Sequence, residues 1–203
     1  YSNFWMIPWG REQGLVIPRD GEPAVIAPRI EYDRPAKMVG DGSGFRDIRI
    51  YADNASAIDG WVGLAQQVLR DRGITSGRIG IEEDNVSITA HKALCAALPD
   101  LEFAEMGYAM MCEQMLKSDE EITLIRDGAE ICDLGAQAFV DAVRDGVTEV
   151  QVARASVTAM EEEVCRRFPG HECDGTFCWA QSGPENTKVA HGLNTDRKIH
   201  SGD

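Results

Sequence analysis

Short apolar runs separated by turn residues occupy the first half of the chain. Residues 14–18 and 24–28 form two such runs on either side of Asp20-Gly21, a dipeptide that favours the tight turn of a β-hairpin. After a further run at residues 48–51, apolar positions recur at helical spacing up to Gly73, which is typical of a helix C-cap. Strands that alternate with helices predict an α/β domain. The pattern continues with a strand at 78–82, a helix at 89–98 and a strand at 101–104.

The pattern changes at Lys117, after which helical spacing becomes longer and more regular. Ser118 followed by Glu121 is a capping box, which indicates a helix start, and an apolar stripe then continues to Gly146. Thr148 is placed to cap a second helix. The two apolar stripes are Ile122, Ile125, Ala129, Cys132, Ala136, Phe139 and Val143, then Val150, Ala153, Val157, Met160 and Val164. Because the strands that would follow residues 179–181 are expected beyond Asp203, we expect an apolar helix face to be left uncovered. We predict a boundary near residues 115–118, and two domains at 1–116 and 117–203.

A single histidine near the end of the chain is the candidate catalytic residue. Residues 176–181 predict a strand that leads into a small-residue turn and then to His191, which is followed by Gly-Leu-Asn-Thr. Histidine is the side chain whose ordinary pKa lies near neutrality, so an imidazole held rigidly in a loop can transfer a proton. A lone histidine is also a common surface or structural residue. Spacing alone therefore leaves both roles open for His191.

A loop near the start of the chain is the candidate substrate-binding element. Residues 8–11, Pro-Trp-Gly-Arg, precede the predicted hairpin and place an aromatic ring beside a guanidinium. A guanidinium offers paired N–H donors that match a carboxylate. We therefore predict that Trp9 and Arg11 bind substrate, whereas the neighbouring Phe4 and Trp5 are interpreted as part of an ordinary strand and its loop.

Net charge restricts the classes of partner. With 20 Lys and Arg against 34 Asp and Glu, the formal charge is −14, which disfavours nucleic acid and anionic membrane because both are bound through Lys and Arg. Apolar runs fall short of the length that a membrane helix needs. The acidic triplet Glu161–Glu163 is predicted to face water. The chain begins at Tyr1 and ends at Asp203 on a Gly-Asp turn that usually leads into a strand, so we expect further residues on both sides.

The six cysteines are scattered and form no Cys-x-x-Cys pair. Reduced, partly buried thiols in a cytoplasmic protein are the simplest interpretation. A zinc cluster built from Cys165, His171, Cys173 and Cys178 is the alternative, but this spacing matches no common zinc module.

Several stretches, taken in order, resemble the creatinase, prolidase and aminopeptidase P family. They are Ile79-Gly80-Ile81-Glu82 with Asp84, Lys117–Glu121, Ile125–Ala129, Val147-Thr148-Glu149, Gln181-Ser182-Gly183, His191, Arg197 and Gly202-Asp203. The resemblance implies a ribonuclease-H-like N-terminal domain followed by the first part of a catalytic domain with the pita-bread fold. The expected fold class is thus α/β, or α+β.

Within this family the creatinase branch is the more similar one. By that resemblance His191 falls at the catalytic histidine. Trp9 and Arg11 fall at an aromatic residue and an arginine that the partner subunit lends to the site, which implies a homodimer. The chain departs from the branch by having Trp rather than Phe at position 9, a longer segment between Gly183 and His191, and Gly192-Leu193 after the histidine.

Three functions are compatible with these observations. The favoured one is a creatinase-like amidinohydrolase without a metal cofactor, in which His191 moves protons and Arg11 holds a carboxylate of a small-molecule substrate. The second is an Xaa-Pro aminopeptidase or dipeptidase, in which two divalent ions (Mn, Co or Zn), held by residues beyond Asp203, activate water against a dipeptide. The third is a non-catalytic pita-bread protein that binds peptides or basic proteins, and the retained His191 loop argues against it.

Overall fold

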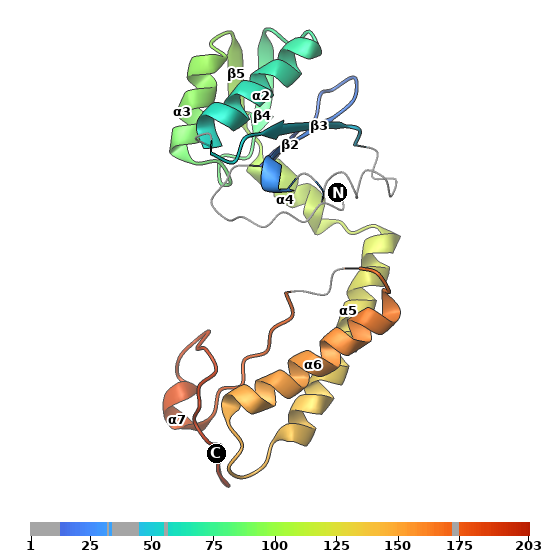
Figure 1. Ribbon diagram of the computed structural model, residues 1–203, viewed down its shortest axis with the longest axis vertical. Coiled ribbons are helices and arrows are strands. Elements are labelled where there is room, and N and C mark those ends of the chain that lie inside the picture. The colour runs from blue at the N-terminus through green and yellow to red at the C-terminus, as the bar shows by residue number, and fades with distance from the viewer. Residues whose placement is uncertain (1–12, 32, 34–44, 55–56, 172–174) are drawn as a thin grey trace. The chain divides into compact units, whose positions relative to one another are not determined.

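The computed structural model describes residues 13–31, 33, 45–54, 57–171 and 175–203, which belong to two compact units, Tyr1–Met115 and Leu116–Asp203 (Figure 1). The candidate residues Trp9 and Arg11 lie outside the described residues, as does Cys173. Within the described ranges, no helix is long and apolar enough to cross a membrane.

The strands of the first unit form two small sheets. In the first sheet, β2 is the central strand, antiparallel to β1 and parallel to β3; in the second, β4 and β5 are parallel. The strands are β1 (Gly14–Val16), β2 (Ala24–Pro28), β3 (Asp47–Tyr51), β4 (Gly77–Ile81) and β5 (Leu101–Glu105). The predicted hairpin is confirmed, and Gly21 in its turn has a φ of 107°, which a glycine adopts without strain. All of β2 is buried, as expected for a strand with neighbours on both sides.

Helices connect these strands and supply the other side of the core. They are the short 3-10 helix η1 (Arg29–Glu31), α2 (Ala57–Asp71), α3 (Ile88–Ala97) and α4 (Gly107–Met115). One apolar face of α2 packs on the sheet, and Gly60 permits the close approach because a Cβ there would lie 2.7 Å from the ring of Tyr51. Helix α4 was not predicted. Its side chains are mostly exposed, so it lacks the apolar stripe that marks a helix in sequence.

Two long helices dominate the second unit, α5 (Asp119–Ala142) and α6 (Glu149–Arg167), followed by the short α7 (Gly183–Asn186). The predicted capping box of Ser118 with Glu121 forms. Thr148 caps α6 as predicted, and Gln151 completes a second capping box that was not predicted. The two helices pack against each other, and Arg167 near the end of α6 pairs with Asp127 near the start of α5 at 3.2 Å.

The apolar stripe predicted for α5 is largely uncovered in this unit. Ile125, Ala129, Cys132 and Ala136 are exposed, and the buried residues of α5 are Ile131 and Gly135. A Cβ at Gly135 would lie 2.5 Å from Met160, so this glycine lets α6 approach closely on the neighbouring face. Apolar residues occupy two faces of α5, and their period does not say which face α6 covers. On α6, Ala153 and Met160 are buried as predicted, together with the unpredicted Glu149, Val152 and Ser156.

The acidic triplet is also not uniformly solvated. Glu163 is 14% exposed and pairs with both Arg166 and Arg167, at 2.6 and 2.7 Å. These arginines hold the pKa of the Glu163 carboxyl down to about 2.

Candidate functional site

The segment that carries His191 is joined to the start of α6 by backbone pairing. The amide of Ile199 donates to the carbonyl of Val147 at 2.8 Å, and the amide of Gly146 donates to the carbonyl of Ile199 at 2.8 Å. Apolar side chains lie beneath this pairing and form a small core. Its buried members are Val147, Val152, Ala153 and Ala180.

The strand predicted at residues 176–181 is not formed; these residues have no regular secondary structure. The side chain of Asn194 makes part of the hydrogen bonding that a neighbouring strand would otherwise provide. The amide of Asn194 donates to the carbonyl of Cys178 at 2.8 Å, and its oxygen accepts from the backbone N–H of Ala180 at 2.7 Å. An Asn side chain presents the same donor and acceptor as a peptide group, so it can satisfy the backbone where a neighbouring strand is absent.

His191 lies in an exposed turn, and its backbone is unusual. Its φ is 57°, and among the described residues it is the one non-glycine with a positive φ. Left-handed backbone is uncommon in residues with a Cβ, although His tolerates it better than most, and such strain persists where the surrounding structure imposes it. The imidazole packs edge-on against the ring of Trp179, with centroids 5.2 Å apart, and Phe177 lies on Trp179 at the same separation. The turn therefore presents a solvent-accessible imidazole beside an aromatic surface.

Two further contacts fix the turn. The side-chain amide of Gln181 donates to the carbonyl of Val189 at 2.7 Å, and the amide of Gly192 donates to the same carbonyl at 3.2 Å. A Cβ at Gly192 would overlap the Gln181 amide, so a larger residue directly after the histidine would displace that side chain from Val189. The Gly that follows His191 thus has a packing role in the loop.

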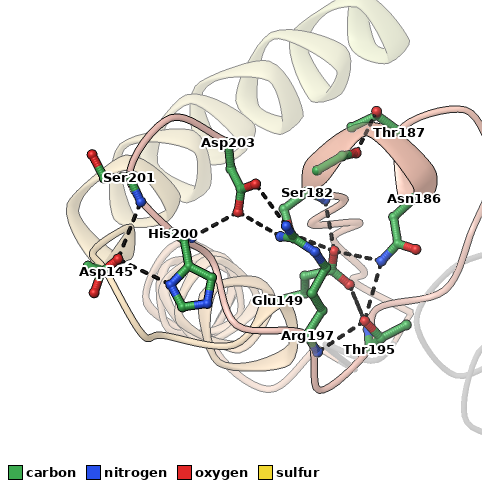
Figure 2. A network of polar contacts seen from close by, with 11 residues as sticks. Asp145, Glu149, Ser182, Asn186, Thr187, Thr195, Arg197, His200, Ser201 and Asp203 are labelled. Carbon is green, nitrogen blue, oxygen red and sulfur yellow. Dashed lines mark hydrogen bonds and ion pairs between the residues drawn. The ribbon is translucent and has the colours of Figure 1, made fainter.

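A buried carboxylate lies at the base of the loop (Figure 2). Glu149, the first residue of α6, has no exposed surface and accepts five hydrogen bonds, from Ser182, Asn186 and Thr195. Burial raises the pKa of this carboxyl, but the donors outweigh burial and lower the pKa to about 2, from an ordinary 4.5. The carboxylate is therefore ionised at neutral pH. Its place in the first turn of α6 is also favourable, because the helix dipole stabilises negative charge there.

Arg197 extends this network (Figure 2). Its guanidinium donates to Ser182 Oγ at 2.7 Å and to both oxygens of Asp203, at 2.7 and 2.8 Å. The guanidinium lowers the pKa of Asp203 to about 2. Gly183 is needed here, since its φ is 71° and a Cβ would lie 2.5 Å from the guanidinium. Ser182 therefore links the buried Glu149 to the Arg197–Asp203 pair.

The sequence predicts His191 as the candidate residue, but it does not predict how the loop is held. Glu149, Ser182 and Arg197 stand out there only as parts of motifs, and nothing in the sequence indicates that Ser182, Asn186 and Thr195 converge on Glu149. Within the described ranges, no three His, Cys, Asp or Glu side chains are grouped so that they could hold a metal ion.

Residues 1–112 match the Creatinase/Prolidase N-terminal domain family. The chain belongs to the creatinase/prolidase family. It is 36% identical over 203 residues to creatinase from Bacillus sp. (strain B-0618), a match that covers 100% of this chain and 47% of that protein. It is 25% identical over 165 residues to an Xaa-Pro dipeptidase from Lactobacillus delbrueckii subsp. lactis, covering 81% of this chain and 42% of the relative.

A solved structure in the same family shows the fold. The X-Pro aminopeptidase from Thermotoga maritima MSB8 superposes with a TM-score of 0.71 at 18% identity, covering 100% of this chain and 49% of that one. The expected mixed α/β fold, with the creatinase/prolidase N-terminal domain and the first part of a pita-bread domain, is thereby confirmed. The chain spans about half the length of the relatives that it matches.

Proposed function

We propose that this chain is part of a hydrolase that cleaves a C–N bond in a small substrate, with His191 as the group that moves the proton. The observation that supports this most is the His191 backbone. A histidine in left-handed conformation, exposed and set against Trp179, indicates a structure that imposes the position of an imidazole. A surface histidine without a role would not need such a conformation.

We further propose that the substrate is an amidino compound of the creatinase type. The 36% identity to a creatinase extends over the whole chain, whereas the identity to an Xaa-Pro dipeptidase is 25% over a shorter part. The Xaa-Pro peptidase remains the second candidate because that relative is also matched across most of the chain. Its activity would depend on divalent metal.

The test is hydrolysis by the full-length protein of creatine and of an Xaa-Pro dipeptide, each with and without a chelator. The proposal expects hydrolysis of the amidino compound that a chelator does not abolish. Chelator-sensitive hydrolysis of the dipeptide alone would favour the peptidase instead.

His191→Ala should lower turnover by about 10²–10⁴-fold, the range for losing a general acid or base. His171→Ala is the matched control because His171 is exposed and packs on Phe168, away from the loop. A fully active His191→Ala enzyme would refute the role of this histidine.

We also propose a homodimer in which Trp9 and Arg11 of one subunit complete the pocket of its partner. The basis is the family resemblance of the Pro-Trp-Gly-Arg segment and the match of residues 1–112 to the family's N-terminal domain. The test mixes chains bearing Arg11→Ala with chains bearing His191→Ala. Shared sites would regenerate one intact site in a mixed dimer and recover activity, whereas independent sites would recover none.

A further inference from the structure

The buried carboxylate of Glu149 is satisfied by neutral groups. Its donors are two backbone N–H groups, two hydroxyls and one side-chain amide. Arg197 is one step removed, joined to Glu149 through the hydroxyl of Ser182. A charge removed from water is tolerated only if hydrogen bonds replace its hydration, so each of these donors is needed. Loss of any one donor therefore weakens the hold on the carboxylate.

The two oxygens of Glu149 bind opposite ends of the His191 loop. Oε1 accepts from the backbone and hydroxyl of Ser182, at 2.8 and 2.7 Å, and from Asn186 at 3.0 Å. Oε2 accepts from the backbone and hydroxyl of Thr195, at 3.0 and 2.6 Å. Ser182 and Thr195 lie on either side of His191 in sequence. One rigid group on the first turn of a long helix thus closes the loop at its base.

We propose that Glu149 is a positioning residue for His191. By fixing both loop ends, its carboxylate holds the turn in which His191 keeps its left-handed backbone and its contact with Trp179. The kinetic part of this inference rests on the proposed function, while the structural part does not. A displacement of about 1 Å of a catalytic group lowers turnover by about 10²-fold, so a loosened loop would reduce kcat although Glu149 touches no substrate.

Only a carboxylate fits this role. Glutamine has nearly the same shape, but its NH₂ group would face the N–H and hydroxyl donors of either Ser182 or Thr195, whichever way the amide is turned. Glu149→Gln therefore releases one end of the loop and leaves the helix itself intact. Glu163→Gln is the matched control, because Glu163 is likewise a largely buried, hydrogen-bonded glutamate on α6. Its partners are Arg166 and Arg167 rather than residues of the loop.

The experiment uses the full-length protein and three measurements on wild type, Glu149→Gln and Glu163→Gln. Hydrogen exchange of residues 187–195 should accelerate by about tenfold or more in Glu149→Gln alone, because the loop opens locally. The fluorescence of Trp179, in a background with Phe at the other tryptophan positions, reports the ring contact with His191. Glu149→Gln should shift this emission toward that of His191→Gln, in which the contact is removed, whereas Glu163→Gln should leave it unchanged. With the amidino substrate, kcat should fall by about 10²-fold with little change in KM.

Unchanged exchange and fluorescence in a folded Glu149→Gln protein would overturn the proposal. If that variant does not fold, Thr195→Val and Ser182→Ala each remove one donor from one oxygen and should loosen the same segment. No change in either would equally refute the positioning role. Exchange and fluorescence do not need an active enzyme. A protein that hydrolyses no test substrate therefore disproves the proposed function while these two measurements still decide the role of Glu149.

Discussion

Because Glu149 is held in its ionised state, the free energy of unfolding of the second unit should depend on pH. The folded pKa of about 2, against an ordinary 4.5, corresponds to about 3 kcal/mol of stability at neutral pH, since one pKa unit is worth about 1.4 kcal/mol. The folded pKa is depressed, so this stability is fully present above pH 4.5 and is lost as the pH falls through about 2. By the same relation roughly 1 kcal/mol remains at pH 3.

Glu149→Gln removes the titrating group and should remove this pH dependence with it. The measurement is urea unfolding of the full-length protein at pH 6 and pH 3, followed by Trp179 fluorescence in a background with Phe at every other tryptophan position, Trp5, Trp9 and Trp61 among them. The free energy of unfolding should be lower in the variant at both pH values, and the deficit should be about 2 kcal/mol larger at pH 6 than at pH 3.

Glu162→Gln, on the exposed side of the same helix, controls for the loss of one negative charge. An equal deficit at pH 6 and pH 3 would show that the carboxylate is not selectively stabilised in its ionised form. The five donors would then not favour the ionised carboxylate over its protonated form, even if the variant is less stable.

Two further changes test how the helices are placed. Ser118→Ala removes the side-chain oxygen that caps α5 and should lower the free energy of unfolding by about 1 kcal/mol, measurable by urea unfolding. Gly60→Ala places a Cβ against the ring of Tyr51 and should destabilise the first unit by about 1–3 kcal/mol. Gly63→Ala, on the same helix but with open space around it, should instead stabilise the unit by about 0.5–1 kcal/mol; equal effects of the two substitutions would contradict the packing described.

Local interactions made much of this chain predictable from sequence. Features that depend on residues a few positions apart formed as expected: the β1–β2 hairpin, the capping box of Ser118 with Glu121, the cap at Thr148 and the starts of both long helices. The end of α5 differs, because the apolar stripe was predicted to continue to Gly146 and the helix ends at Ala142. His191 could be selected for a similar reason, because a lone imidazole in a polar loop is visible in the sequence. The family motifs also needed no structure.

Tertiary structure decided which faces meet and what holds the candidate site. Ile125 and Ile131 both suit a helix core, and the close approach allowed by Gly135 brought α6 onto the face of Ile131. The side chain of Asn194 forms hydrogen bonds with the backbone of Cys178 and Ala180, where a strand had been predicted. Hydrophobic periodicity cannot indicate this arrangement, because it depends on a polar side chain that is distant in sequence.

Glu149 shows the same limit at the site. Its position after the cap Thr148 suggests a favourable but exposed charge at a helix start, and the sequence gives no reason to bury it. Its donors lie 33 to 46 residues away, at Ser182, Asn186 and Thr195. Local sequence sets the preference of each residue for helix or turn. The convergence of neutral donors on one carboxylate exists only after the chain has folded back on itself, because the energy that holds it comes from groups that are distant in sequence and adjacent in space.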